Sequence, residues 1–543
     1  MATASLPDTS DKSPAPTAPA DEKPYAHIEL PPLTGSARMW GTLALSAATF
    51  MNVLDTSIAN VSLPAIAGDL GVSPNQGTWV ITSFGVANAI SVPLTGWLSQ
   101  RFGQVRLFMI SVILFVISSW LCGLAPNMTT LIIFRIMQGL AAGPLIPLSQ
   151  TLLLSSYPKA LAGLAMALWS MTTLVAPVLG PLLGGWITDN ISWPWIFYIN
   201  IPVGFGAAFM IWKIYHKRES QIRKLPIDSV GLALLVLWIG ALQIMLDKGQ
   251  ELDWFHSGEV IALGIVALVG LIAFVIWELT EEHPVVDLRL FKRRNFWAGA
   301  LALSIGYGLF FGNVVVLPLW LQQFMGYTAT QAGMIMAPVG LMALVFSPIV
   351  GKNIGKVDPR RMATFAFLTF ALVLWMRSHF NTQADFWTIM IPTIIQGVAM
   401  AFFFIPLVTL TLSGISPDKI PAASGLSNFA RITAGSFGTS IATTVWQDRA
   451  AMHHAHIADT VNTGSQAANS AMAGLGSAGL TPDQALGTIN RLVDQQAYML
   501  AASDVFYVSA LIFLALIPLV YLARPAKPGT GGASSADAAA GAH

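Results

Sequence analysis

Three charged residues stand out inside long apolar runs of this sequence: Asp55, Arg135 and Arg431. If those runs span a membrane, each charge costs ~2.5 to 3.5 kcal/mol on insertion scales. A residue kept there at such a cost needs an oppositely charged partner, or it serves an ion or substrate path. These three residues are therefore the first candidates for function.

Asp55 and Arg135 are expected at similar depths. Asp55 precedes Leu63, the outer end of its run, by about 12 Å of helix, and Arg135 lies about 8 Å inside its own outer end. In one interpretation Asp55 binds and releases a coupling proton, while Arg135 favours the ionised carboxylate so that the proton can leave. In the other, the two form a static ion pair that fixes helix packing. The first interpretation makes the proton gradient the driving force and requires no cofactor.

Arg431 lies in the segment GLSNFARITAGSFG, where Gly425, Gly435 and Gly438 allow neighbouring backbones to approach closely. It either binds an anionic substrate or a second carboxylate, or acts as a buried structural hydrogen-bond donor. Aromatic and amide side chains elsewhere in the runs are candidate substrate contacts, although aromatic residues at helical spacing more often form a core; they are Trp169, Phe311, Asn313, Trp320 and Phe403.

The composition predicts an all-α membrane protein that positions these residues. Of the 543 residues 54% are hydrophobic and only 10% charged, against roughly a quarter charged in soluble domains. Apolar runs near the ~20 residues that span a bilayer occur at 39–59, 79–98, 107–125, 129–150, 161–186, 195–214, 228–247, 258–277, 296–321, 330–351, 362–378, 386–412, 422–446 and 501–523. They predict fourteen transmembrane helices: a first half of six over 39–214, a connector at 215–227, two extra helices over 228–277, and a second half of six over 278–523.

The distribution of Lys and Arg predicts the orientation, because basic residues in short loops stay in the cytoplasm. With a cytoplasmic N-terminus, external loops hold only Lys248, Arg377, Arg449 and Arg491. Both termini are then cytoplasmic, and residues 1–38 and 524–543 have the composition of disordered tails. The external segment 447–500 is unusually long and has helix-forming composition.

Two patterns predict where helices approach closely or move. In the fifth run Ala176, Gly180 and Gly184 recur every four residues beside Pro177, Pro181 and Gly185, which indicates tight packing and a candidate outer gate. The loop GWLSQRFGQVR carries Gly96, Arg101, Gly103 and Arg106, and GKNIGKVDPRR at 351–361 occupies the same place in the second half. Repeated halves are how alternating-access transporters are built.

The stretches LDTSIANVSLP, LIIFRIMQG, APVLGPLLGG, WPWIFYINIPVG and LQIMLDKGQELDWF resemble the fourteen-span drug:proton antiporters of the major facilitator superfamily over nearly the whole chain. The resemblance implies export of hydrophobic drugs from the inner membrane of a Gram-negative cell, with a periplasmic adaptor and an outer-membrane channel as partners. One position departs from the family: Gln100 stands where its cytoplasmic loop usually has an acid, so that acid-based gate cannot be carried over.

Other function classes find little support. The net charge of +1 gives no basic field for nucleic acid, and no P-loop, nucleophile elbow, HExxH or dinucleotide motif supports an enzyme. Cys122 lies in an apolar run and is expected to pack there. The MHHAH stretch matches no standard metal spacing and is expected to be solvated surface. Two alternatives to multidrug export remain: a dedicated exporter of one metabolite class, such as fatty or aromatic acids, and a scaffold that transports nothing.

Overall fold

The computed structural model of the chain describes residues 31–72, 74–158, 161–222, 226, 228–249, 251–461 and 465–525. Most of the two predicted tails lies outside these ranges. The first helix begins at Gly35, inside the predicted N-terminal tail, so the helix extends four residues before the predicted span.

Every regular element in the described ranges is helical, as the sequence predicts. The long helices are α1 (Gly35–Asp69), α3 (Trp79–Phe102), α4 (Gln104–Gly123), α5 (Met128–Ala142), α6 (Leu145–Ser156), α7 (Ala162–Asn190), α9 (Asn200–Tyr215), α10 (Ser229–Lys248), α11 (Gly258–Thr280), α12 (Arg294–Phe324), α13 (Ala329–Asn353), α14 (Pro359–Arg377), α15 (Phe386–Leu412), α16 (Ile420–Thr460), α17 (Gln466–Ser477) and α18 (Pro482–Tyr521). Short helices α2 (Pro74–Gly77) and α8 (Trp195–Tyr198) precede α3 and α9.

The predicted spans all fall on these helices, two of them on a pair. Among the described residues, 10 helices are long and apolar enough to cross a membrane. The predicted spans on α1, α7, α14 and α16 are not among these ten. The fourth predicted span is split into α5 and α6 at Gly143 and Pro144, since proline has no N–H to continue the helical bonds.

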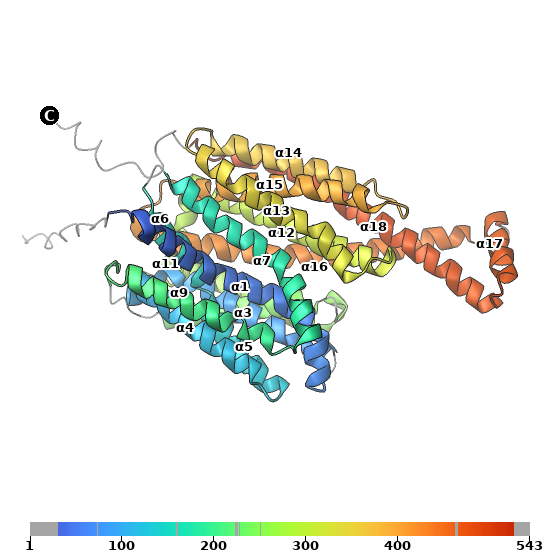
Figure 1. Cartoon of the computed structure of the whole chain (residues 1–543), viewed down its shortest axis with the longest axis horizontal. Helices are drawn as coiled ribbons and strands as arrows, with labels where there is room; N and C mark the ends of the chain where they lie inside the picture. The colour runs from blue at the N-terminus through green and yellow to red at the C-terminus, as the bar shows by residue number, and fades with distance from the viewer. Residues whose placement is uncertain are drawn as a thin grey trace, which may run out of the picture.

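The helices form two bundles that pack side by side (Figure 1). In the first bundle α1 packs on α7 and α9, and α3 packs on α5; in the second, α12 packs on α16 and α14 on α15 and α18. The bundles touch where α7 packs on α13 and where α3 packs on α16. Helix α6 also packs on α16, and α7 on α15, where the bundles meet. The site residues lie within each bundle and along the contacts between the bundles.

The two extra helices attach to both bundles. Helix α10 packs on α3 and α16. Gln243 of α10 donates to Ser436 of α16 at 2.9 Å, and Lys248 donates to Thr78, next to α3, at 3.3 Å. Helix α11 covers the outside of α10 and exposes large apolar side chains, as a lipid-facing helix does. The pair thus sits beside the seam between the halves.

The long segment 447–500, which is predicted to be external, is helical over most of its described length. Helices α16 and α18 continue past the bundle as a hairpin with α17 at its tip (Figure 1). Aromatic side chains anchor the base of the hairpin: Tyr498 stacks on Phe324 with ring centroids 4.1 Å apart, and Trp446 donates to the Tyr498 carbonyl at 3.0 Å. The predicted external helix is therefore an extension of two spans together with α17.

Candidate functional site

Asp55 of α1 and Arg135 of α5 form an ion pair in the first bundle. Arg135 Nη1 lies 2.6 Å from Asp55 Oδ2, and both side chains are fully buried. The similar depths expected from the sequence therefore bring the two charges together. Breaking a buried pair from one side leaves an uncompensated charge and typically destabilises by about 3 to 5 kcal/mol.

Two amides complete the hydrogen bonding of Asp55. Gln138 Nε2 donates to Asp55 Oδ1 at 3.0 Å, and Asn200 Nδ2 donates to the same oxygen at 2.9 Å. Both amides also donate to Ser119 Oγ, at 3.0 and 2.8 Å. The sequence analysis did not single out these amides. Gln138 was recognisable, because it lies three residues after Arg135 on the same helix face.

Arg135 is held on several sides. Its Nε donates to the Val80 carbonyl at 2.9 Å and its Nη1 donates to Gln138 Oε1 at 2.7 Å. The guanidinium carbon lies 4.3 Å from the centroid of the Phe84 ring and 5.5 Å from that of Phe197. This packing stabilises the cation in a dry site. A proton can reach Asp55 only if the surrounding helices move, since 1% of its surface is exposed.

The small-residue face of α7 packs on α1 beside the ion pair. A Cβ at Gly180 would collide with Ser57, and one at Gly184 would lie 3.0 Å from Ile58. Ser57 and Ile58 follow Asp55 closely, so the expected close packing of this face is found at the site itself. Gly185 is partly buried. Pro177 and Pro181 belong to α7, but their side chains lie outside the described residues.

The loop of the first half that is predicted to be cytoplasmic lies where the two halves meet. A Cβ at Gly96 would lie 2.6 Å from the Ala422 Cβ on α16. Arg101 lies over the Trp97 ring at 5.4 Å, and Arg106 lies at the start of α4. A second approach of this kind joins Gly163 of α7 to Gly351 of α13, where a Cβ would lie 2.7 Å from the Gly351 carbonyl oxygen. Both contacts are at the ends predicted to be cytoplasmic.

An acid from the connector binds at this loop, although Gln100 replaces the acid of the family pattern. Glu219 accepts hydrogen bonds from the backbone N–H groups of Val105 at 3.0 Å and Arg106 at 2.8 Å, at the N-terminus of α4. A carboxylate is stabilising there because the helix dipole is positive. Gly103 has φ +89°, and a Cβ on it would lie 2.5 Å from the Glu219 carboxylate.

The matching loop of the second half carries its own acid. Asp358 accepts from the backbone N–H of Arg360 at 3.0 Å and caps α14. Partial burial opposes ionisation of Asp358, but the hydrogen bonds and charge of Arg360 outweigh it and lower the pKa of the carboxyl. The two repeated loops thus place a carboxylate at the same helix end by different routes.

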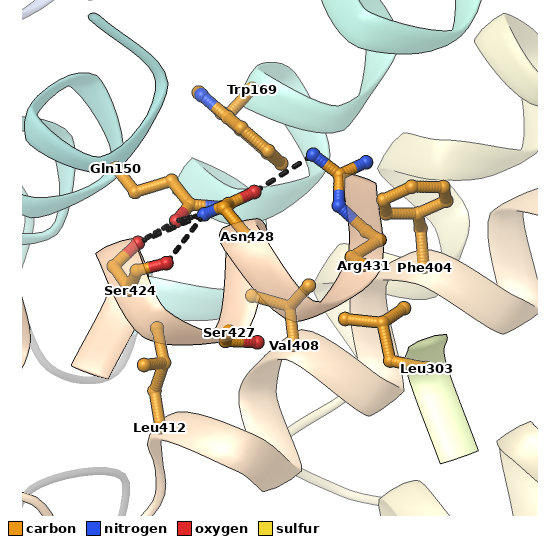
Figure 2. A pocket seen from close by; sticks show the side chains of 10 residues that line it. All are labelled: Gln150, Trp169, Leu303, Phe404, Val408, Leu412, Ser424, Ser427, Asn428 and Arg431. Atoms are coloured by element: carbon orange, nitrogen blue, oxygen red, sulfur yellow. Dashed lines mark hydrogen bonds between the residues drawn. The ribbon is translucent and has the colours of Figure 1, made fainter. Parts of the chain in front are cut away.

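A small cavity lies between the two halves, with room for about one water molecule at about 10 Å³ (Figure 2). Gln150 of α6 faces α16 across it and accepts from Asn428 Nδ2 at 3.0 Å and from Ser424 Oγ. Trp169 of α7 also lines the cavity and donates to Ser149 at 2.9 Å. These hydrogen bonds join the first half to the second.

Arg431 of α16 lines the same cavity. Its Nη2 donates to Asn428 Oδ1 at 2.8 Å, and its guanidinium carbon lies 4.6 Å from the Tyr307 ring centroid and 5.2 Å from that of Phe404. No carboxylate of the described residues forms an ion pair with it, so the expected alternative of a second carboxylate partner is not found there. Its charge is held by aromatic rings and one amide.

The other predicted substrate contacts lie away from this cavity, in the packing of the second half. Asn313 donates to Ser509 at 3.1 Å. The rings of Trp320 and Phe403 pack against Phe380 and Phe370, with centroids 6.1 and 5.7 Å apart. Phe311 lies 4.3 Å from the Tyr307 ring. Of the six candidate contacts, only Trp169 and Arg431 line the cavity.

Arg377 is a buried residue that the sequence placed in an external loop. It ends α14 with its side chain turned into the bundle, where Nη2 donates to Gln396 Oε1 at 2.6 Å and to Thr393 Oγ1 at 3.0 Å. Its Nε and Nη1 have no partner in the described part of the chain. The assignment to a loop was wrong because only the side-chain direction, not the position at a helix end, decides burial.

The histidines of the external segment pair with acids on the neighbouring helix. His453 Nε2 lies 2.8 Å from Asp504 of α18, and His454 Nε2 lies 3.5 Å from Asp494. No group of three or more metal-ligating side chains occurs among the described residues. The stretch therefore joins α16 to α18.

Comparisons with known proteins identify the family. The sequence profile described as Major Facilitator Superfamily matches residues 45–439. The chain belongs to the major facilitator superfamily. It is 51% identical over 506 residues to the multidrug export protein EmrB of Escherichia coli K12, covering 93% of this chain and 99% of that protein. It is 50% identical over 505 residues to the fatty acid resistance protein FarB of Neisseria gonorrhoeae, and the match covers 93% of this chain and 100% of that protein.

The fold of this superfamily member is also that of solved transporters. The human organic anion transporter TETRAN superimposes with a TM-score of 0.59 at 13% identity, covering 89% of this chain and 99% of that one. A double-Trp XylE mutant superimposes with a TM-score of 0.52 at 16% identity, covering 89% and 97%. Similarities at this identity establish the shared fold alone, and the all-helical transporter fold is therefore confirmed.

Proposed function

We propose that this chain is a proton-coupled multidrug exporter of the bacterial inner membrane, which moves hydrophobic or amphipathic small molecules outward by alternating access. The observation that carries the proposal is the fully buried pair of Asp55 and Arg135 in a chain 51% identical to a multidrug export protein. A static pair could be replaced by apolar side chains at no loss of stability. A protonatable acid at this depth instead suits an ion path.

The chemistry of the pair supplies the coupling. When a proton binds Asp55, the carboxylate loses its charge and Arg135 becomes a buried cation without a counter-ion. The side-chain amides of Gln138 and Asn200 donate to the Asp55 carboxylate, and these hydrogen bonds weaken when the carboxylate loses its charge. The cost of the unpaired cation drives the helices toward a conformation in which the charge is again compensated. The proton gradient is the only energy source, and no cofactor takes part.

Alternating access requires the halves to separate at one face while they close at the other. The approaches of Gly96 to Ala422 and of Gly163 to Gly351 close the cytoplasmic face in this conformation. In this proposal α1, α7, α14 and α16 also cross the membrane, which makes fourteen spans. Both termini are then cytoplasmic, and the closed face of the molecule is the cytoplasmic one. The cavity that Arg431 and Trp169 line is then the inner part of the substrate path.

The remaining partners follow from the relatives and the external hairpin. Drug substrates and membrane lipid contact the spans, and a periplasmic adaptor with an outer-membrane channel completes the route out of the cell. The hairpin of α16, α17 and α18 is the part of the chain that projects farthest toward such an adaptor (Figure 1).

Reconstituted vesicles with a pH gradient test the coupling. The wild-type chain is expected to move protons when an exported drug is added, and Asp55→Asn is expected to abolish that movement. Asp358→Asn, the same change at a carboxylate that caps α14 away from the pair, serves as a matched control for the vesicle preparation. Full substrate-driven proton movement in Asp55→Asn would defeat the proposal.

A second candidate function is export of one class of acids, such as fatty or aromatic acids. Arg431 favours it, because this guanidinium faces the cavity without an acidic partner in the described residues. The relative named for fatty acid resistance points the same way. Export of laurate together with ethidium supports the multidrug proposal, whereas export of laurate alone supports the dedicated one.

A further inference from the structure

The hydrogen bonds around the cavity form one continuous chain across the two halves. Arg431 donates to Asn428 Oδ1, and Asn428 Nδ2 donates to Gln150 Oε1 of the first half (Figure 2). Ser424, Asn428 and Arg431 are spaced four and three residues apart, so they share one face of α16. This series of hydrogen bonds begins at a charged group in the cavity, Arg431, and ends at a contact between the halves, Gln150. Binding of a ligand at Arg431 can therefore change the contact between the halves.

Arg431 sets the orientation of the Asn428 side chain. An amide presents oxygen on one side and nitrogen on the other. With the oxygen bound to Arg431 at 2.8 Å, the nitrogen is turned toward Gln150 Oε1 at 3.0 Å. The Asn428 nitrogen also donates to the Ser424 carbonyl oxygen at 2.8 Å. Loss of the Arg431 bond therefore removes one of the interactions that fix this orientation and weakens the bond between the halves.

We propose that Gln150, Ser424, Asn428 and Arg431 form an inner latch that is released when the carboxylate of an amphipathic substrate binds Arg431. The inference rests on the proposed export function and adds to it the substrate class and the trigger of the inner gate.

The charge at the site favours a carboxylate. Both bidentate arrangements of a guanidinium use Nη2, the nitrogen that now donates to Asn428. Nη2 carries two hydrogens, so a carboxylate competes with the Asn428 amide in the arrangement that uses the same hydrogen. The present bond to Asn428 already has a charged donor, and a carboxylate adds a charged acceptor and a second, bidentate bond. The carboxylate therefore wins, and it also neutralises a buried cation that has no acidic partner in the described residues.

The walls of the cavity suit the rest of such a substrate. Leu303, Val408, Leu412 and the ring of Phe404 line it beside the polar latch. In the latched conformation the space is close to that of one water molecule, so an alkyl or aromatic tail fits only after the halves have begun to part. Entry of the substrate and release of the latch are consequently one event.

Cysteine labelling reports the state of the latch. Ser427→Cys is a nearly isosteric change at a residue that lines the cavity and is 7% exposed. The native chain has only Cys122, which is buried, and provides the unlabelled background. The protein is reconstituted in vesicles without a gradient, and the rate of labelling by a maleimide from the cytoplasmic face is measured with laurate, dodecanol or dodecylammonium.

Laurate is expected to raise the labelling rate at Ser427→Cys, while dodecanol and dodecylammonium leave it unchanged. Adding Arg431→Gln is expected to remove the laurate response and to weaken laurate binding by roughly tenfold to a hundredfold, the worth of hydrogen bonds to a charged group. Gln150→Ala, which removes the acceptor of the latch, is expected to give rapid labelling with or without laurate. An equal response to laurate and dodecanol, or a laurate response that survives Arg431→Gln, would overturn the inference.

The outcome is separable from that of the proposed function. Proton-coupled export of ethidium by Arg431→Gln, combined with no laurate response in the wild type, leaves the export proposal intact and rejects the latch. Drug-driven proton movement that persists in full in Asp55→Asn rejects the export proposal. The labelling measurement still decides the latch in that case, because it needs no gradient. Thermal unfolding of each variant shows that it is folded.

Discussion

The two halves of this transporter each bury an arginine between aromatic rings, but they neutralise it differently. In the first half Arg135 lies 4.3 and 5.5 Å from two ring centroids and pairs with Asp55. In the second half Arg431 lies 4.6 and 5.2 Å from two ring centroids and donates to an amide. Similar packing of a guanidinium between aromatic rings therefore supports two different tasks. A cation with a resident carboxylate can respond to a proton, whereas a cation without one can receive an anion.

The largest effect is expected at the complete ion pair of Arg135 and Asp55. Arg135→Ala leaves Asp55 buried without its counter-ion and is expected to lower the free energy of unfolding by about 3 to 5 kcal/mol and to abolish drug export. Arg431→Ala removes no ion pair and is expected to cost clearly less stability. Thermal unfolding in detergent measures both, and equal losses would remove the distinction between the two arginines.

An intermediate effect is expected at Gln138, which supports both members of the pair. Gln138→Leu removes the donor to Asp55 and the acceptor for Arg135, and is expected to destabilise by about 1 to 3 kcal/mol while lowering substrate-driven proton movement. Gln396→Leu, at the corresponding amide beside Arg377, serves as the control. Coupling that falls equally in both variants would show that the loss is not specific to the Asp55 network.

A smaller effect is expected at Arg377, which is buried like the other two arginines but is not among the residues that line the cavity between the halves. Arg377→Met replaces a buried charge with an apolar chain and is expected to be neutral or to stabilise by about 1 kcal/mol. Export should persist at normal expression. If drug export is lost in a well-folded Arg377→Met protein, a buried arginine that does not line the cavity would also be required for export. Arg431 would then not be distinguished by its position.

The smallest effect is expected at the repeated loops. Glu219→Gln keeps one acceptor at the N-terminus of α4 but removes the charge, so it is expected to cost about 0.3 to 1 kcal/mol. Asp358→Asn, at the matching end of α14, should behave alike. Denaturant unfolding of the two variants compares them, and a much larger loss in either would show that its loop does more than cap a helix.

The fold was largely predictable because lipid requires long apolar helices. The pairing of Asp55 with Arg135 was also predictable, since both charges lie at similar depths in apolar runs. Polar helix outside the membrane is not marked by hydropathy, and so the extensions of α16 and α18 were predicted less well. The split of the fourth span depends on Pro144, a signal that was present in the sequence.

Several site residues could not be predicted from local patterns. Glu219 reaches α4 from a connector 113 residues away, and connectors have no periodicity that orients a side chain. The hydrogen bond between Gln150 and Asn428 depends on which faces of α6 and α16 meet. Burial of Arg377 depends on the direction of one side chain at a helix end. Each case is decided by tertiary packing.

The double variant Asp55→Asn with Arg135→Gln tests the central claim most directly. It removes both charges together and leaves neither one buried without a counter-ion, so the protein is expected to fold. If the pair couples transport to protons, vesicles containing this variant will bind drug but will show no drug-driven proton movement. If the variant exports drug with full proton movement, the pair is a packing device and the coupling proton is bound elsewhere.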